Sequence, residues 1–211
     1  VEKLIPVGDK EIAYNLKEKN SEYILIGERN GIKLPEFDYG NSPSQIKNID
    51  FSQKTVIHTT SCGTQGIINA QNADEIITGS LVNAKAIVKY IEENNFEDIS
   101  IVSMCRPHEF PTDEDELCAK YLKSLLEKTE LENLEEEIEK LKLTNGKKFF
   151  DKESAYSFLY LSINFLSVVT YLPLVLSVYI KPNSSNSTKA FCIVFGLTFV
   201  NNANSLTDKS F

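Results

Sequence analysis

The chain has 211 residues, of which 42% are hydrophobic and 25% charged, enough apolar material to bury one good-sized core. Its formal net charge of −8 argues against a nucleic-acid partner, because binding to a phosphate backbone needs clustered Lys and Arg. The four cysteines have no C-x-x-C spacing, which argues against a disulfide framework or zinc site and makes a reducing cytoplasm the expected compartment.

Short apolar runs alternate with helical patterns over the first 153 residues. The predicted strands are Leu4–Val7, Tyr23–Ile26, Thr55–His58, Glu75–Thr78 and Ile99–Val102. One helix is predicted from Asp9, and another, capped by Asn83, carries apolar residues at helical spacing. This alternation predicts an α/β fold with a mainly parallel sheet flanked by helices, and we expect residues 1–153 to form one domain.

Two further helices are predicted before residue 153. Thr112 followed by Asp115 is typical of a capping box, which would open the first of them. The second is rich in glutamate, which we interpret as a solvated helix face. Its apolar positions are Leu131, Leu134, Ile138 and Leu141.

A loop over residues 27–43 follows the second predicted strand, where open α/β sheets place their ligand crevices. Glu28 and Asp38 offer the hard oxygen ligands that Mg²⁺ prefers, and Arg29 and Lys33 could hold the oxygens of an anion. The alternative is a surface loop whose charges are solvated and whose Gly, Asn and Pro residues form turns.

Residues 58–64 leave a strand and enter a helix, so hydroxyls and backbone N–H groups would meet at a helix N-terminus, a natural place for an anion. Simple helix capping is the alternative. The four consecutive acids at 113–116 also have two explanations, either capping at the positive end of a helix or metal binding with activation of water.

No histidine, cysteine or aspartate of the chain has the sequence context expected of a nucleophile. His58 and His108 are given no role, since a histidine at the end of an apolar strand is more often a core residue than a catalytic one. Cys62 lacks the Arg that a cysteine-dependent phosphatase would place a few residues later, because residues 63–68 contain none. No Asp-x-Asp follows an apolar strand, so water activated by a metal ion is the preferred nucleophile.

Four motifs, in the expected order, resemble the 2-phosphosulfolactate phosphatase family. They are GERNGIKLPEFDYGNSP (27–43), HTTSCGTQGI (58–67), ADEIITGSLVNAKAI (73–87) and PTDEDELCA (111–119). The resemblance covers residues 1 to about 153. It implies hydrolysis of 2-phosphosulfolactate to sulfolactate and phosphate with Mg²⁺, a step of coenzyme M synthesis, so the expected ligand is a small anionic phosphate ester.

The resemblance also implies roles for individual residues. It makes Glu28, Asp38, Glu114 and Asp115 catalytic magnesium ligands that converge in one cavity, and it makes Arg29 a catalytic residue beside them. The residues expected to bind the substrate are Arg29, Lys33, Asn41, Ser42, Thr60, Ser61, Gly63 and Thr64.

One family motif has no counterpart in this chain. Family members begin with an Asp-x-Leu-Arg-Ala-Thr type of segment, and its absence leads us to expect a fragment without part of the site. The rival hypothesis is a non-catalytic protein that keeps the fold and binds a ligand or a partner, with or without a membrane tether. The sequence leaves the oligomeric state open, a homo-oligomer included.

Residues 154–211 form an apolar tail that the resemblance does not cover. Within it, residues 155–180 carry no charged side chain and are long enough to span a bilayer. Three interpretations stay open: a membrane helix, an artefact of reading frame or assembly, and strands added to the core. We expect removal of the tail to leave the α/β domain folded.

Overall fold

The computed structural model of the chain describes residues 1–41, 43–46, 48–81, 83–96, 98–104, 113–141, 143–144, 177–178 and 190–194. The elements are β1 (Lys3–Pro6), α1 (Lys10–Lys19), β2 (Ile24–Arg29), β3 (Ile32–Lys33), α2 (Pro43–Ile46), β4 (Thr55–Thr59), α3 (Gly63–Asn69), β5 (Glu75–Thr78), α4 (Ala84–Asn94), β6 (Asp98–Val102), α5 (Asp113–Leu126), α6 (Leu134–Leu141), β7 (Ser177–Val178) and β8 (Ala190–Val194). The predicted α/β class with mainly parallel strands is confirmed, although the strands are divided between two four-stranded sheets.

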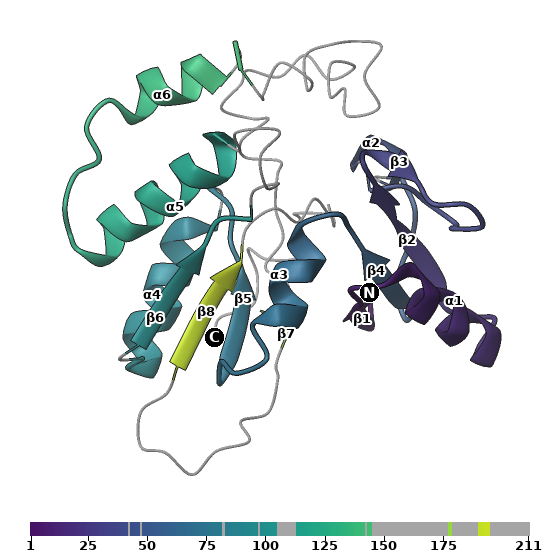
Figure 1. Cartoon of the computed structure of the whole chain (residues 1–211). Helices are drawn as coiled ribbons and strands as arrows, with labels where there is room; N and C mark the ends of the chain where they lie inside the picture. The colour runs from purple at the N-terminus through teal and green to yellow at the C-terminus, as the bar shows by residue number, and fades with distance from the viewer. Residues whose placement is uncertain are drawn as a thin grey trace.

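Figure 1 shows these sheets apart, with α3 between them.

The first sheet has the strand order β1-β4-β2-β3. β1 and β2 both pair with β4 in parallel, and the short β3 returns antiparallel along β2. The sequence places α1 after β1 because Asp9 caps the helix, its carboxylate accepting a hydrogen bond from the Glu11 amide at 3.0 Å. Because β1, β2 and β4 are parallel, their carboxyl ends lie at the same edge of the sheet.

Both faces of the first sheet are buried, as expected for parallel strands covered by helices. On one face, Leu25 and Ile57 pack with Ala13 of α1. On the other face, Ile26 and Val56 pack with partners that include Ile46 of α2. Successive residues of one strand thus enter opposite cores, which explains why these strands are continuous apolar runs and do not alternate with polar residues.

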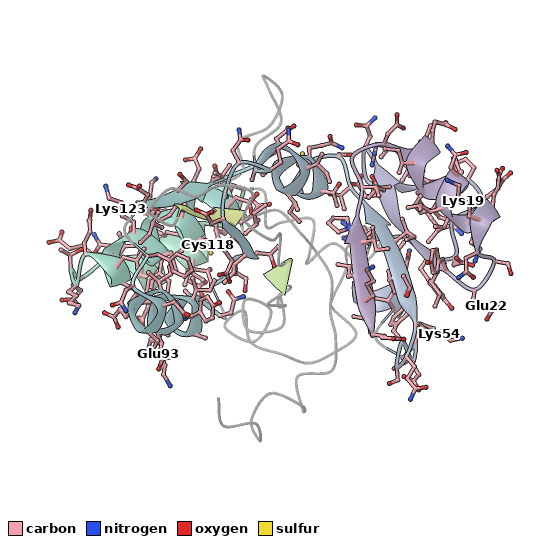
Figure 2. The ribbon with its side chains drawn as sticks, turned by 90° about the horizontal axis from the view of Figure 1, so that it is seen from below. Lys19, Glu22, Lys54, Glu93, Cys118 and Lys123 are labelled. Atoms are coloured by element: carbon pink, nitrogen blue, oxygen red, sulfur yellow. The ribbon has the colours of Figure 1, made fainter. Side chains whose placement is uncertain are left out.

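The second sheet has the strand order β6-β8-β5-β7 and is covered by α4 and α5, with α6 packed on α5 (Figure 1). Figure 2 shows Glu93, Cys118 and Lys123 on this part of the molecule and Lys19, Glu22 and Lys54 on the part that holds the first sheet. The predicted apolar faces are confirmed: Ile87 and Ile91 of α4 contact Leu122 of α5, and Ile138 of α6 packs with Leu117.

The sequence predicts helix caps at Asn83 and Thr112. Asn83 does occupy the N-cap position of α4, but its side-chain oxygen accepts hydrogen bonds from the amide and hydroxyl of Ser80, at 2.8 and 3.0 Å, and none from the helix. The predicted cap position is confirmed, and the Asn83 side chain binds the turn before α4 instead of the helix amides. Thr112 lies outside the described residues, so its capping box stays a prediction.

Part of the apolar tail belongs to the second sheet. β8 lies between β5 and β6 and pairs in parallel with both, with Cys192 opposite Ile76 on one side and Ser100 on the other. β7 pairs antiparallel with β5. These two segments match the third interpretation of the tail, strands added to a core. That the α/β domain folds without the tail stays a prediction, and the position of β8 between β5 and β6 argues against it.

Most of residues 155–180 lies outside the described part of the chain, and the predicted domain boundary at residue 153 stays a prediction. Among the residues that the structure describes, no helix has the length and apolar character needed to cross a bilayer.

The position of β8 leads to a testable result for Ile193→Pro. Proline removes a backbone N–H from a central strand and leaves an acceptor of the ladder without its donor. We expect the free energy of unfolding to fall by about 1–3 kcal/mol in urea denaturation. Ile193→Val keeps the N–H and is the matched control. Equal stability of Ile193→Pro and the parent chain would contradict the placement of β8.

Candidate active site

A hollow of about 830 Å³ lies where β1 and β2 end. Gly8 and Lys10 line it from the turn into α1, Arg29 and Asn30 line it from the end of β2, and Gln65 lines it from α3. Ligand crevices in open α/β sheets form outside the carboxyl ends of the strands, and the hollow occupies this position.

Arg29 ties the ends of three strands together. Its Nη2 donates to the carbonyl oxygen of Gly8 and to the hydroxyl of Thr59, each at 2.8 Å, and its Nη1 donates to the carbonyl oxygen of Glu28 at 2.8 Å. These acceptors follow β1, end β4 and lie on β2, so the guanidinium has a fixed position beside the hollow. The sequence prediction singled out this residue, and the structure places it there.

Glu28 was predicted to bind magnesium, but in the structure its carboxylate accepts hydrogen bonds from two backbone amides and a hydroxyl. Its Oε1 accepts from the Ser61 amide at 2.7 Å, and its Oε2 accepts from the Gly31 amide at 2.7 Å and from the Ser61 hydroxyl at 3.0 Å. The residue is buried, and these charge-assisted hydrogen bonds compensate for the cost of burial. Glu28 therefore holds the β2–β3 turn against the loop that follows β4.

Thr60 and Thr64 hold the turn that leads into α3, whose N-cap residue Cys62 makes no side-chain capping hydrogen bond. The Thr60 hydroxyl accepts from the Thr64 amide at 3.1 Å, while the Thr64 hydroxyl accepts from the Thr60 amide at 2.8 Å. Both threonines are completely or almost completely buried, and Gly63, the first residue of α3, is buried as well. Each threonine thus satisfies the backbone N–H of the other, and the predicted role of Thr60 and Thr64 in binding substrate stays a prediction.

Asp38 and Lys33 stabilise the loop that contains them. Oδ2 of Asp38 accepts from the Leu25 amide at 2.7 Å and from Lys17 at 3.4 Å. Lys33 donates to the carbonyl oxygen of Phe37 at 2.8 Å. Leu25 precedes Glu28 by three residues on β2, a separation of about 10 Å along a strand, so Asp38 and Glu28 do not form one cation site.

Glu114 and Asp115 lie in the first turn of α5, which covers the second sheet. In the part of the chain that the structure describes, no group of three or more His, Cys, Asp or Glu side chains could hold a metal ion. The prediction that Glu28, Asp38, Glu114 and Asp115 converge is thus not met by the structure. Ser42 lies outside the described residues, and its role stays a prediction.

Comparison with known proteins decides the family. The family model described as 2-phosphosulpholactate phosphatase matches residues 1–161, about three quarters of the chain. The chain belongs to the 2-phosphosulfolactate phosphatase family. This agrees with the four motifs found in the sequence.

Relatives in this phosphatase family come from several bacteria. A probable 2-phosphosulfolactate phosphatase of Carboxydothermus hydrogenoformans is 39% identical over 125 residues, 59% of this chain and 51% of the relative. One of Clostridium novyi is 32% identical over 159 residues, 74% of this chain and 65% of the relative. One of Bacillus subtilis is 28% identical over 150 residues, 70% of this chain and 64% of the relative. The chain thus spans about half to two thirds of the length of these family members.

Most residues that line the hollow of this phosphatase-family chain were not predicted from the sequence, among them Gly8, Lys10 and Gln65. The side-chain Nε2 of Gln65 donates a hydrogen bond to the carbonyl oxygen of Gly8 at 2.6 Å and so fixes α3 against the turn after β1. The sequence could have indicated the turn at Gly8, because Gly8 and Asp9 lie between an apolar strand and a helix. Residues 58–64, which were predicted to bind an anion, have the same position between a strand and a helix. No local pattern could have indicated Gln65, whose partner lies 57 residues away.

His58 has a buried, structural environment, which agrees with giving it no catalytic role. Its Nε2 lies 3.1 Å from Oδ1 of Asn41, so Asn41, predicted to bind substrate, contacts this core histidine. Burial lowers the pKa of His58 from 6.5 to about 4.

This pKa shift predicts a pH dependence of stability. Between pH 6.5 and 4 the unfolded chain binds a proton at His58 that the folded chain does not, so acid favours unfolding. Stability from this group is fully present above pH 6.5 and falls by about 3 kcal/mol as the pH drops through 4. Urea denaturation of the parent chain and His58→Asn at several pH values isolates the contribution. Parallel pH profiles for the two proteins would contradict it.

Proposed function

We propose that the chain carries the anion-binding part of a phosphatase that hydrolyses 2-phosphosulfolactate, or a similar small phospho-acid, to sulfolactate and phosphate. The observation that carries the proposal is the fixed guanidinium of Arg29 at the hollow, at the carboxyl edge of a parallel sheet. Family membership and the names of the relatives agree with this chemistry. In an organism that makes coenzyme M, the reaction would belong to its synthesis.

Arg29 has the capacity to bind the phosphoryl group. Its contacts with described residues use three of its five N–H groups, which leaves two for oxygens of an anion. Because the other three hold the side chain in place, little conformational freedom is lost when an anion binds. Lys10 adds a positive charge to the same hollow, although it lies 4.0 Å from Glu11 in an exposed ion pair. The two cations would reduce the repulsion between an anionic ester and its nucleophile.

Glu28 and Ser61 position the site. The Ser61 hydroxyl donates to Glu28 and accepts from the amide of Asn30 at 2.9 Å, so it links the ends of β2 and β4. Asn30, which lines the hollow, is held in a left-handed conformation with φ 55° by this network. We propose that Glu28 acts through Ser61 and Asn30 and does not itself touch the substrate.

The described residues do not fit a magnesium ion shared by the four predicted carboxylates. A magnesium requirement remains a proposal that rests on the family resemblance. Excess EDTA is expected to abolish phosphate release, and excess Mg²⁺ is expected to restore it. Undiminished phosphate release in EDTA would show that magnesium is not required. A cytoplasmic location is likewise proposed, supported by the spacing of the cysteines, which is not that of a disulfide framework.

Phosphate release also separates this proposal from the rival class, a non-catalytic binding protein. The assay uses 2-phosphosulfolactate with the whole chain, and free phosphate is measured over time. Release above the uncatalysed rate supports the phosphatase. A folded chain that binds the ester without releasing phosphate would support the rival.

A further inference from the structure

The hollow beside Arg29 has two kinds of wall. Lys10, Arg29 and Gln65 supply charged and polar groups, whereas Ile12, Leu34 and Ile68 supply apolar surface. Ile12 belongs to α1 and is 50% exposed, and Ile68 belongs to α3 and is 41% exposed. The apolar wall is therefore open to whatever enters the hollow.

The relative position of the two isoleucines is fixed by the fold. The hydrogen bond from Gln65 to Gly8 joins α3 to the turn from which α1 starts. Ile68 follows Gln65 by three residues, close to one helical turn, and Ile12 lies in the first turn of α1. Single exposed apolar residues are normal on a protein surface. Here two large ones from different helices line one hollow together with two cations.

The apolar wall does not suit 2-phosphosulfolactate itself. That ester has three carbons and carries phosphate, sulfonate and carboxylate groups, so it has almost no surface that would gain from contact with isoleucine. The volume of about 830 Å³ lies in the range of pockets that take much larger ligands. A ligand that complements both walls has an anionic end for Lys10 and Arg29 and a hydrocarbon arm for Ile12 and Ile68.

We propose that the hollow accepts phosphate monoesters with a hydrocarbon arm, such as simple alkyl phosphates. This inference rests on the proposed function, because it assumes that the phosphoryl group binds at Arg29. The arm then lies along the wall formed by Ile12, Leu34 and Ile68. The substrate class of this chain is accordingly broader and more apolar than the family name suggests.

Alkylphosphonates test the inference without turnover, because their carbon–phosphorus bond is not hydrolysed by a phosphatase. Dissociation constants of methyl-, propyl- and pentylphosphonate are measured by calorimetry with the whole chain. Each added methylene is expected to tighten binding about two- to fourfold, the upper value being that of full burial. Equal affinity across the series would overturn the inference. The apolar wall would then be a surface for contact with a protein segment.

Variants of the wall give the second arm of the test. Ile12→Ser and Ile68→Ser should flatten the dependence on chain length and leave the affinity for methylphosphonate unchanged. Ile32→Ser is the matched control, since Ile32 is 73% exposed on β3 and does not line the hollow. Loss of the chain-length dependence in Ile32→Ser as well would overturn the assignment. Thermal unfolding of each variant verifies that it is folded.

Arg29→Ala distinguishes failure of this inference from failure of the proposed function. It should weaken the binding of all three phosphonates by a similar factor of about ten or more. If Arg29→Ala weakens binding but chain length has no effect, only the apolar arm is wrong. If methylphosphonate binds equally well to Arg29→Ala and the parent chain, the phosphoryl site itself is misplaced and both proposals fall.

Discussion

Gly27→Ala is expected to lower the free energy of unfolding by about 3 kcal/mol or more. Gly27 lies on β2 opposite Thr59 of β4, and a Cβ at this position would overlap the carbonyl oxygen of Thr59. It would also lie 3.1 Å from Cε2 of the buried Phe37. Because a backbone carbonyl cannot move without moving β4, the two strands must separate. Urea denaturation followed by circular dichroism measures the loss.

Gly40→Ala is the matched control for this prediction. A Cβ at Gly40 would overlap the side-chain oxygen of Gln45, which is the far end of a flexible, exposed side chain and can move away. We expect a cost below about 1 kcal/mol. Similar stabilities for Gly27→Ala and Gly40→Ala would mean that β2 and β4 are not packed as described. Arg29 follows Gly27 by two residues, so phosphate release should fall together with stability.

Arg29→Ala is expected to lower kcat/KM for phosphate release by about 10²–10³-fold, which is the loss typical when one preorganised donor to a developing charge is removed. The substitution removes a guanidinium that donates to Gly8, Thr59 and Glu28. Arg29→Lys keeps the charge but cannot make three hydrogen bonds in the same fork, so it should recover only part of the activity. Steady-state kinetics on both variants gives the comparison.

Lys54→Ala controls for the loss of a positive charge. Lys54 precedes β4, at the end of the strand opposite to Thr59, and its exposed ammonium lies 3.9 Å from Glu22 (Figure 2). An exposed ion pair of this kind contributes little to stability, and we expect unchanged kinetics. Full activity of Arg29→Lys would show that charge alone is sufficient and would contradict the role given to the fork.

Much of the local structure could be predicted from the sequence, because apolar periodicity reports directly on strands and helices. The strand around Val56 and Ile57 and the helix around Ile87 have the predicted positions. The structure places Arg29 at the end of β2 beside the hollow, and its role in binding an anion stays a prediction. The division into two sheets could not be predicted, because periodicity does not say which strands pair.

The functions of the carboxylates could not be predicted for a related reason. Glu28 and Asp38 were read as metal ligands from their residue type, but their partners are backbone amides brought together by the fold. An amide has no signature in the sequence, so a structural carboxylate and a metal ligand look alike there. β8 poses the same problem, since a short apolar run suits both a buried strand and part of a membrane segment.

The most direct test of the central claim is the initial rate of phosphate release from 2-phosphosulfolactate by the whole chain, measured side by side with Arg29→Ala and Lys54→Ala. We predict release by the parent chain, about 10²–10³-fold lower kcat/KM in Arg29→Ala, and an unchanged rate in Lys54→Ala. No release by the folded parent chain, or equal rates for Arg29→Ala and the parent, would contradict a phosphatase site built around Arg29.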